Sequence, residues 1–290
     1  MAGISNKKLQ DEHKRLAVRR IICYVVLIAV TVLSLFSFYI LIVNSTRSHP
    51  DIQKGFSALP GKSFFVNLKN ILQNDNLPVL SGIWNSILVS TGTAALSTYF
   101  SAMTAFGIHA YDFKLKKAAF AFIMMVMLVP TQVSALGFVK LMATMGLKDS
   151  FIPLIIPSIA SPIVFFFMKQ YMESALPIEI VEAARIDGSN EFHTFNFIVM
   201  PIMKPAIAVQ AIFTFVTAWN NYFLPALLLD SQEKKTLPIL IAQLRSADFM
   251  KFDMGQVYIL IFIAIVPVII VYLLLSKFIV RGVALGSVKG

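Results

Sequence analysis

Six apolar stretches, separated by polar segments, dominate this chain of 290 residues. Each comes close to the ~20 residues that an α-helix needs to cross the ~30 Å hydrocarbon core of a bilayer. Hydrophobic residues make up 57% of the chain and charged residues only 14%, a composition typical of membrane proteins. We therefore predict an all-α integral membrane protein with six transmembrane helices, at residues 21–43, 83–108, 118–141, 151–168, 206–229 and 257–275.

Two of these stretches have features that predict packing against other parts of the protein. The fourth contains prolines, and a proline frees backbone groups that lipid cannot satisfy, so this kinked helix needs protein or a cavity beside it; they are Pro153, Pro157 and Pro162. The second has small residues at steps of four and three, which predict a face for close helix packing. That face comprises Ser90, Ala94, Ser97, Ser101 and Ala105.

Lysine and arginine set the orientation in the membrane. With the N-terminus inside, fifteen of the 25 basic residues flank the spans on the cytoplasmic side, which favours cytoplasmic positions for both termini. We predict a multi-pass protein of the cell membrane with a cytoplasmic segment at 1–20 and a transmembrane domain at 21–290. Residues 44–82 and 230–256 form outer loops, and a cytoplasmic tail covers roughly 277–290.

Charge and motif content argue against several function classes. The net charge of +10 comes from basic residues at membrane edges, where they meet anionic lipid, so we do not expect nucleic-acid binding. Cys23 is the only cysteine and the four histidines are scattered, so we expect no metal site. Gly61-Lys62-Ser63 lacks the earlier glycine of a phosphate-binding loop. No span carries a buried Asp, Glu or Arg of the kind that proton- or sodium-coupled transporters commonly use.

Between the fourth and fifth spans, residues 172–204 predict a cytoplasmic helix-turn-helix. Pro177 suits the first turn of the first helix, and Gly188 can end it in a left-handed conformation. Ser189 can cap the second helix, which Pro201 then halts. Ile180, Ala183, Ala184 and Asp187 share one face of the first helix, with Glu182 and Arg185 beside it. Physical reasoning alone also allows a connector folded back onto its own bundle.

The motif within this segment resembles the Glu-Ala-Ala loop of permease subunits in binding-protein-dependent ABC importers. It runs Glu182-Ala183-Ala184, then Gly188, then Ile198-Val199-Met200-Pro201, with Met200 where that pattern usually has leucine. Leu176-Pro177, Asp187-Gly188, Trp219-Asn220 and the ending from Gly286 to Gly290 resemble the carbohydrate branch, specifically the shorter partner subunit of maltose-type importers. The resemblance covers roughly the whole chain.

The resemblance implies a permease subunit of an ATP-driven sugar importer, with an oligosaccharide as the expected solute. It implies three partners: a second permease subunit that completes the pathway, a cytoplasmic ATPase dimer and an extracytoplasmic sugar-binding protein. ATP and Mg²⁺ are then used by the ATPase, and this chain is neither an enzyme nor a cofactor carrier. By the same resemblance the coupling residues are Glu182, Ala183, Ala184, Asp187, Gly188 and Pro201, and the tail residues Ser287 and Lys289 reach toward the ATPase.

Amides and aromatic rings at membrane depth suggest where a solute passes. Trp219, Asn220, Asn221 and Tyr222 lie in the fifth stretch and Gln132 in the third, and such groups suit a sugar. They can equally fasten helices together, and for Asn221 and Gln132 we favour that role. Two other functions stay open: a secondary transporter working without an ATPase, and a membrane scaffold that transports nothing.

Overall fold

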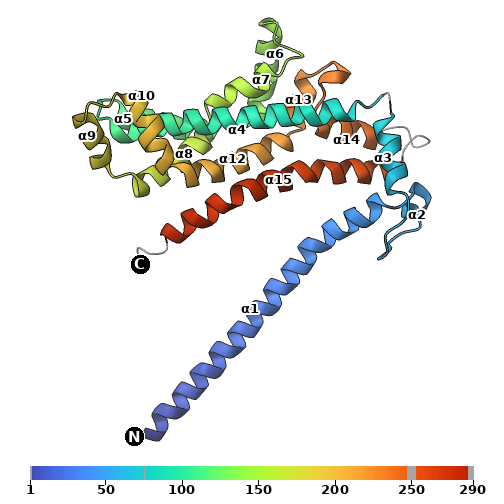
Figure 1. The fold of residues 1–290 in the computed structure, drawn as a ribbon, viewed down its shortest axis with the longest axis horizontal. Helices are drawn as coiled ribbons and strands as arrows, with labels where there is room; N and C mark the ends of the chain where they lie inside the picture. The colour runs from blue at the N-terminus through green and yellow to red at the C-terminus, as the bar shows by residue number, and fades with distance from the viewer. Residues whose placement is uncertain (1, 75, 247–252, 287–290) are drawn as a thin grey trace. The chain divides into compact units, whose positions relative to one another are not determined.

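The computed structural model describes residues 2–74, 76–246 and 253–286 (Figure 1). This part of the chain contains α-helices joined by loops and by short 3-10 and π segments, and it holds no β-strand, which confirms the all-α prediction. The chain divides into two compact units, Met1–Asn70 with Asp253–Phe262 and Ile71–Phe252 with Ile263–Gly290. The long helix α15 (Met254–Gly286) contributes to both units.

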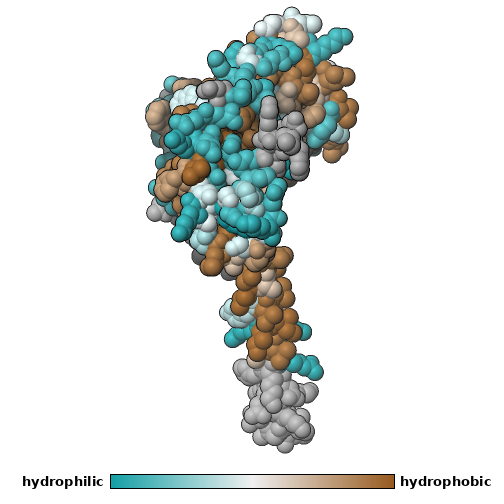
Figure 2. Space-filling model, turned by 90° about the vertical axis from the view of Figure 1, so that its right-hand side faces the viewer, coloured by the Kyte–Doolittle hydropathy of each residue, from teal (hydrophilic) through white to brown (hydrophobic). Residues whose placement is uncertain are grey.

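The first unit contains α1 (Ala2–Ser45), α2 (His49–Gln53), most of α3 (Phe64–Leu72) and the start of α15. Within Arg15–Ser45 the mean hydropathy of α1 reaches 2.7, and no side chain of that most apolar window is buried inside the chain. Figure 2 shows the same apolar surface along the coloured part of this helix. A surface of this kind requires lipid or another protein around it.

The loop after α1 is held in a defined shape by its polar side chains. The Asn67 amide donates to the carbonyl of Ser45 over 3.1 Å and to that of Arg47 over 2.9 Å. The buried Arg47 guanidinium donates to Asn44 Oδ1 over 3.0 Å and to the carbonyl of Gly55 over 2.9 Å. These bonds satisfy backbone groups that would otherwise be orphaned by the end of the helix.

The second unit is built around α4 (Val79–Ala110), which packs against α8 (Pro162–Ala175) and α12 (Lys204–Trp219). The predicted small-residue face of α4 is confirmed, because all five of its members are buried: Ser90, Ala94, Ser97, Ser101 and Ala105. Small side chains let helix backbones approach closely, which explains why this long helix occupies the centre of the unit (Figure 1).

The two ends of α4 contact different parts of the chain. At its start, Asn85 donates to the carbonyl of Glu233 over 2.7 Å, and Ser86 Oγ accepts from the N–H of Leu237 over 2.8 Å, which joins α4 to the 3-10 helix η3 (Gln232–Lys234) and α14 (Leu237–Arg245). Just beyond its end, the Tyr111 ring contacts Arg185 in α9 (Ile178–Ile186). The two segments therefore lie at opposite ends of one membrane-length helix (Figure 1).

In the described part of the chain, four helical segments are long and apolar enough to cross a membrane: Arg15–Ser45, Val79–Ala110, Ile152–Ala175 and Met254–Lys277. They correspond to the first, second, fourth and sixth predicted stretches. Among the described residues the number rises to six if two bent helix pairs are each counted as one span, namely Lys116–Met127 with Thr131–Thr144 and Glu191–Ile202 with Lys204–Trp219. The structure thus confirms a multi-pass helical protein with four to six candidate spans.

The third predicted span is not one straight helix. It divides into α5 (Lys116–Met127) and α6 (Thr131–Thr144), which meet at an angle of 94°. Pro130 explains the break, because a proline disfavours helical backbone in the preceding residue and cannot donate to the turn before it. The apolar run continues across this bend, so hydropathy alone does not reveal it.

The fifth predicted span, 206–229, is also interrupted. Helix α12 ends at Trp219, and α13 (Phe223–Leu228) starts after a three-residue gap. Pro225 in α13 lacks the N–H that would bond the carbonyl of Asn221, so a continuous helix would leave that carbonyl unpaired. The fourth span bends as its prolines predict, through α7 (Ile152–Ile155) and the 3-10 helix η1 (Ile156–Ile159) before α8.

Asp149 joins two loops at the α14 end of the unit. Its carboxylate accepts from the N–H groups of Asp230 and Ser231, both over 3.0 Å, from the hydroxyl of Ser231, and from Lys234 Nζ over 3.1 Å. Its own N–H donates to the carbonyl of Leu228 over 2.8 Å. These bonds, those of Ser231 above all, lower the pKa of Asp149 well below its ordinary value.

Candidate functional site: a surface hairpin and a polar pocket

The segment predicted as a helix-turn-helix starts with α9, and its turn has the expected geometry. Pro177 is the residue just before the first helical position, with extended backbone angles. Gly188 has a φ of 78°, which confirms the left-handed turn. Gly188 N–H donates to the carbonyl of Arg185 over 3.0 Å and Ser189 N–H to that of Ala184 over 2.9 Å. This pair of bonds is a Schellman motif, which fixes where the helix ends.

The second arm of the hairpin consists of α10 (Glu191–His193), a π-helical segment η2 (Thr194–Val199) and α11 (Met200–Ile202). The prediction that Ser189 caps this arm is wrong by one residue. Asn190 is the cap, and its Oδ1 accepts from the N–H of His193 over 2.8 Å. Ser189 is already used in closing the turn, and its hydroxyl contacts Thr194 Oγ1 over 2.9 Å.

Pro201 does not halt the second arm, as the sequence had suggested. The helix continues through it to Ile202, and the chain turns by 80° into α12 at Met203. The π-helical turn upstream supplies the reason, because its wider hydrogen-bond spacing makes room for a ring that would clash with the carbonyl four residues earlier. Pro201 therefore lies one turn before the corner.

An ion pair fastens the two arms to each other. Arg185 Nε donates to Glu191 Oε1 over 2.8 Å, and its Nη2 donates to Glu191 Oε2 over 3.3 Å. The same guanidinium lies 5.0 Å from the centre of the Tyr111 ring, just beyond the end of α4. Such two-pronged pairs restrict orientation as well as distance. The turn of the hairpin is thus fixed to the central helix.

The inner face of the hairpin belongs to the hydrophobic core. Val181, Phe195, Val199 and Met203 are at most 3% exposed and pack with residues of α4 and α8. Burying each such side chain contributes about 1.5–3 kcal/mol. Ala184 is also buried, at 5%, so it does not share an outward face with Ala183 as the predicted periodicity had placed it. The hairpin cannot swing freely from the rest of this unit.

The outer face of α9 carries a large, almost fully exposed apolar side chain among acids, while Ile180 elsewhere on the helix is 37% exposed. Five exposed residues of α9 and its C-cap follow helical spacing along one stripe: Glu179, Glu182, Ala183, Ile186 and Asp187. We name these five residues the hairpin face. Ile186 is 86% exposed, so it contributes almost nothing to the fold. A bulky aliphatic group left in water beside three carboxylates is a feature of contact surfaces.

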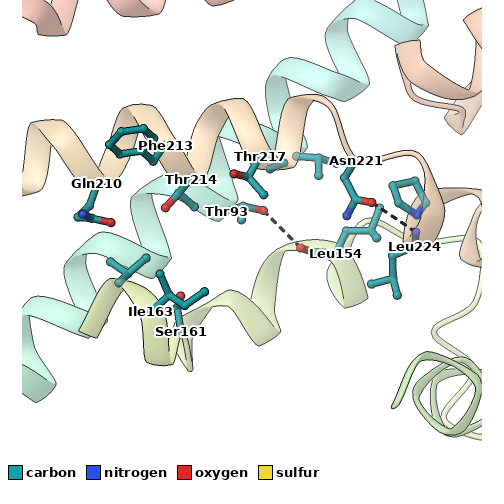
Figure 3. A pocket seen from close by; sticks show the side chains of 14 residues that line it. Thr93, Leu154, Ser161, Ile163, Gln210, Phe213, Thr214, Thr217, Asn221 and Leu224 are labelled. Atoms are coloured by element: carbon teal, nitrogen blue, oxygen red, sulfur yellow. Dashed lines mark hydrogen bonds between the residues drawn. The ribbon is translucent and has the colours of Figure 1, made fainter. Parts of the chain in front are cut away.

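A second feature is a pocket of about 270 Å³ between α4, α7, α8 and α12, seen from close by in Figure 3. Four polar side chains line it along one side of α12 and its extension, at steps of four, three and four residues: Gln210, Thr214, Thr217 and Asn221. Across from them lie Ser161 and Ile163 (Figure 3). We call Gln210, Thr214, Thr217 and Asn221 the polar stripe. The proline-rich fourth span, which was predicted to need protein or a cavity beside it, borders this pocket.

The residues predicted along a solute pathway do not come together here. Trp219 is 2% exposed, its ring stacks on Phe215, and its Nε1 donates to the carbonyl of Ala264 over 3.1 Å, so it fastens helices. Asn221 lines the pocket, whereas Asn220 and Tyr222 are exposed outside its wall. Gln132 is exposed at the start of α6, with only Thr131 as a partner at 3.3 Å.

Residues 97–284, which include the whole hairpin and α12, match the family described as binding-protein-dependent transport system inner membrane component. The arabinooligosaccharides transport system permease protein AraQ of Bacillus subtilis (strain 168) is 37% identical over 210 residues, covering 71% of this chain and 73% of AraQ. The chain belongs to this family of membrane transport components. Another member, the lactose transport system permease protein LacG of Rhizobium radiobacter, is 29% identical and covers 93% of this chain and 96% of its own.

The family assignment agrees with the fold. The structure matches the crystal structure of a bacterial ABC transporter involved in the import of the acidic polysaccharide alginate, with a TM-score of 0.78 and 22% identity over 90% of this chain and 96% of that one. The relatives are named as permease proteins, so this chain is a transport subunit and not an enzyme. The predicted tail residues of the family, Ser287 and Lys289, lie outside the described residues.

Sequence reasoning overlooked three residues that the geometry of this permease brings forward. Ile186 was passed over because an isoleucine in a short helix normally faces the core, and only the burial of Val181 and Ala184 shows that it cannot. Tyr111 is far from Arg185 in sequence, so their contact leaves no local signal. Gln210 did have a signal, namely its helical spacing from Thr214, Thr217 and Asn221.

Proposed function

We propose that this chain is one of two permease subunits of an ATP-driven sugar importer in the cell membrane. It forms half of the solute pathway, and a cytoplasmic ATPase dimer drives it through the hairpin. The observation that carries this proposal is the contrast between the two faces of the hairpin: the inner face is part of the core, and the hairpin face is free. Force applied to the free face therefore reaches α4 and α8 directly.

The relatives support a carbohydrate as the solute. AraQ and LacG are named for arabinooligosaccharides and lactose, and the structural neighbour is involved in importing alginate. A relative named for sn-glycerol-3-phosphate transport, 27% identical, shows that phosphorylated solutes also occur in the family. We therefore favour an oligosaccharide. An extracytoplasmic sugar-binding protein delivers it, and a second permease subunit completes the pathway.

The membrane topology in this proposal has six spans. The bent pair α5 and α6 forms the third, and α12 with α13 forms the fifth. The hairpin and both termini are cytoplasmic, and the loops at 44–82 and 230–256 lie outside. The surplus of lysine and arginine on that side of the spans supports this orientation, and so does the placement of the hairpin and α14 at opposite ends of α4.

In this proposal the hairpin face docks into a groove on the ATPase. Ile186 enters an apolar hole there, while Glu182 and Asp187 meet basic side chains. Gly188 makes the turn, Ala183 allows close approach, and Pro201 lies one turn before the corner into α12. Closure of the ATPase dimer moves the hairpin as a rigid body, which switches the access of the pathway. ATP and Mg²⁺ stay with the ATPase, and Ser287 and Lys289 add a second contact to it.

The test uses the complex purified from its own membrane and reconstituted in vesicles. The proposal expects an ATPase to co-purify, and it expects uptake of lactose or arabinotriose to need ATP and to stop with vanadate. Glu182→Lys and Ile186→Asp should each lower uptake at least tenfold and weaken ATPase retention. Lys62→Glu, an exposed charge change in the loop at 44–82, serves as the control. Uptake that continues without ATP would favour the secondary transporter instead.

A further inference from the structure

We infer that this subunit itself contacts the sugar, in the pocket beside α12, and that the solute is a neutral sugar held by the polar stripe with Gln210 as its main polar contact. This inference rests on the proposed function and assigns a binding site within it. The alternative is that all sugar contacts belong to the second permease subunit, with this pocket only a gap between packed helices.

The Gln210 amide has no protein partner and is reached from the pocket. The residue is 6% exposed, yet no side chain or backbone group in the described parts of the chain donates to it or accepts from it. The amide atoms are not among the buried polar atoms that lack a partner in the described parts of the chain, so water or a solute in the pocket must satisfy them. Gln210 lines the pocket, and a ligand there can satisfy it (Figure 3).

The rest of the stripe extends this polar surface along the pocket. Thr214 and Thr217 lie at one-turn steps above Gln210 and have hydroxyls with no partner among the described residues. Asn221 Oδ1 accepts only a long bond of 3.4 Å from the N–H of Leu224, which leaves its NH₂ group free. The four side chains thus offer both donors and acceptors, as sugar hydroxyls require.

The remaining wall of the pocket is apolar. Leu154, Ile163, Val164 and Phe213 line it, and Figure 3 shows Ile163 across from the polar stripe. A sugar ring has hydroxyls around its edge and C–H groups on its faces, so one polar wall and one apolar wall suit it. The volume of about 270 Å³ is at the small end for ligand sites, which fits one sugar ring at a time.

The uncharged lining of the pocket favours neutral over charged carbohydrates. None of the 14 residues lining it is charged. A uronate or a phosphorylated solute would have to lose its hydration here without meeting a cation, which is costly. A neutral sugar meets no such penalty. The expected solute of this pocket is therefore uncharged.

The first experiment measures whether the stripe is reached by water and by sugar. In a Cys23→Ser background the chain has no cysteine, so Gln210→Cys, Thr214→Cys and Thr217→Cys can each be labelled alone with a water-soluble maleimide. Matched controls on the same helix are Ala208→Cys and Ile212→Cys, which are buried and do not line the pocket. We expect stripe positions to react about tenfold faster than the controls and to be slowed about fivefold by lactose or arabinotriose.

The second experiment measures uptake kinetics in the reconstituted complex. Gln210→Leu removes one hydrogen-bonding group and keeps the volume, so KM should rise about three- to tenfold while the complex still assembles. Gln170→Leu, an exposed amide on α8, should leave KM unchanged. A negatively charged Gln210→Glu variant should lower uptake further, because it places an uncompensated charge in an uncharged pocket.

The outcomes separate the inference from the proposed function. If wild-type complex takes up sugar with ATP but the stripe labels no faster than the controls, or no sugar slows it, this subunit does not hold the sugar and only the inference fails. An unchanged KM in Gln210→Leu leads to the same conclusion. A wild-type complex that takes up neither sugar with ATP overturns the proposed function and this inference together.

Discussion

Arg185 and Glu191 hold each other through two hydrogen bonds, of 2.8 and 3.3 Å, across the turn made by Gly188. The guanidinium also covers the ring of Tyr111, so one side chain touches both arms of the hairpin and the end of α4. A hairpin fixed in this way transmits displacement instead of absorbing it. The stiffness of the turn can therefore be tested by mutation, as can the role of the hairpin face.

Glu191→Gln should loosen the hairpin without unfolding the protein. The variant keeps the shape of the side chain and removes its charge, so the pair with Arg185 loses about 1 kcal/mol, a modest value because both side chains are partly exposed. Hydrogen exchange across residues 178–200 should speed up about fivefold. Glu233→Gln, an exposed acid near the other end of α4, should leave that exchange unchanged. Unaltered exchange in both variants would show that the pair does not stiffen the turn.

Gly188→Ala should lower stability through backbone conformation alone. The φ of 78° is unfavourable for a residue with a Cβ, at a cost of about 1–2 kcal/mol, and no heavy atom lies within 4 Å of the added methyl group. Gly137→Ala is the matched control, because Gly137 lies in regular helix with equally open space, where alanine is favoured. Thermal unfolding of the purified complex should fall for the first variant and hold or rise for the second.

The success of sequence reasoning on this hairpin depended on how local each cause was. A glycine that must be left-handed and a proline at a helix start act within a few residues, so Gly188 and Pro177 were located well. The prediction of Ser189 as the cap failed because the hydrogen bonds that end one helix decide which residue starts the next. Which face of α9 is buried depends on α4 and α8, and no local pattern contains that information.

The difference between local and tertiary causes also explains why the predicted pathway residues do not come together. Trp219, Asn220, Asn221 and Tyr222 stand out in the sequence because they are adjacent, but adjacent helical residues point in different directions. The structure separates them and instead groups residues spaced by one turn. A polar side chain that faces a pocket without a protein partner, such as Gln210, can be recognised only when the neighbouring helices are in place.

Lowering the pH should weaken the contact between the two loops that Asp149 joins. The pKa of this carboxyl is lowered from an ordinary 3.8, so its ionised form stabilises the folded loops. The stabilisation of the folded loops by the ionised carboxylate is fully present above pH 3.8. It declines as the pH falls below that value, because Asp149 takes up a proton more readily in the unfolded loop than in the folded one. Hydrogen exchange at residues 229–236 should therefore rise only below this pH.

Asp149→Asn provides the comparison for that measurement. The variant retains a side chain of the same shape but cannot carry the charge that Lys234 and the two N–H groups bind. Exchange at 229–236 should be about tenfold faster than in wild type at pH 7 and should show no further step in acid. A step of equal size in the variant would assign the acid response to another group.

Trp219→Phe should separate a packing role from a role in solute binding. The variant keeps an aromatic ring to stack on Phe215 but loses the bond to the carbonyl of Ala264 and leaves a small void, at a combined cost of about 1–3 kcal/mol. The melting temperature of the complex should fall, while KM for sugar stays at the wild-type value. Trp84→Phe is the matched control, since this other tryptophan is 65% exposed and should change neither quantity. Gln210→Leu is expected to show the opposite pattern, with KM raised and melting hardly altered, because its amide has no protein partner to lose. If Trp219→Phe raises KM without a change in melting, the ring contacts the solute, and the pocket beside α12 is not where the sugar is held.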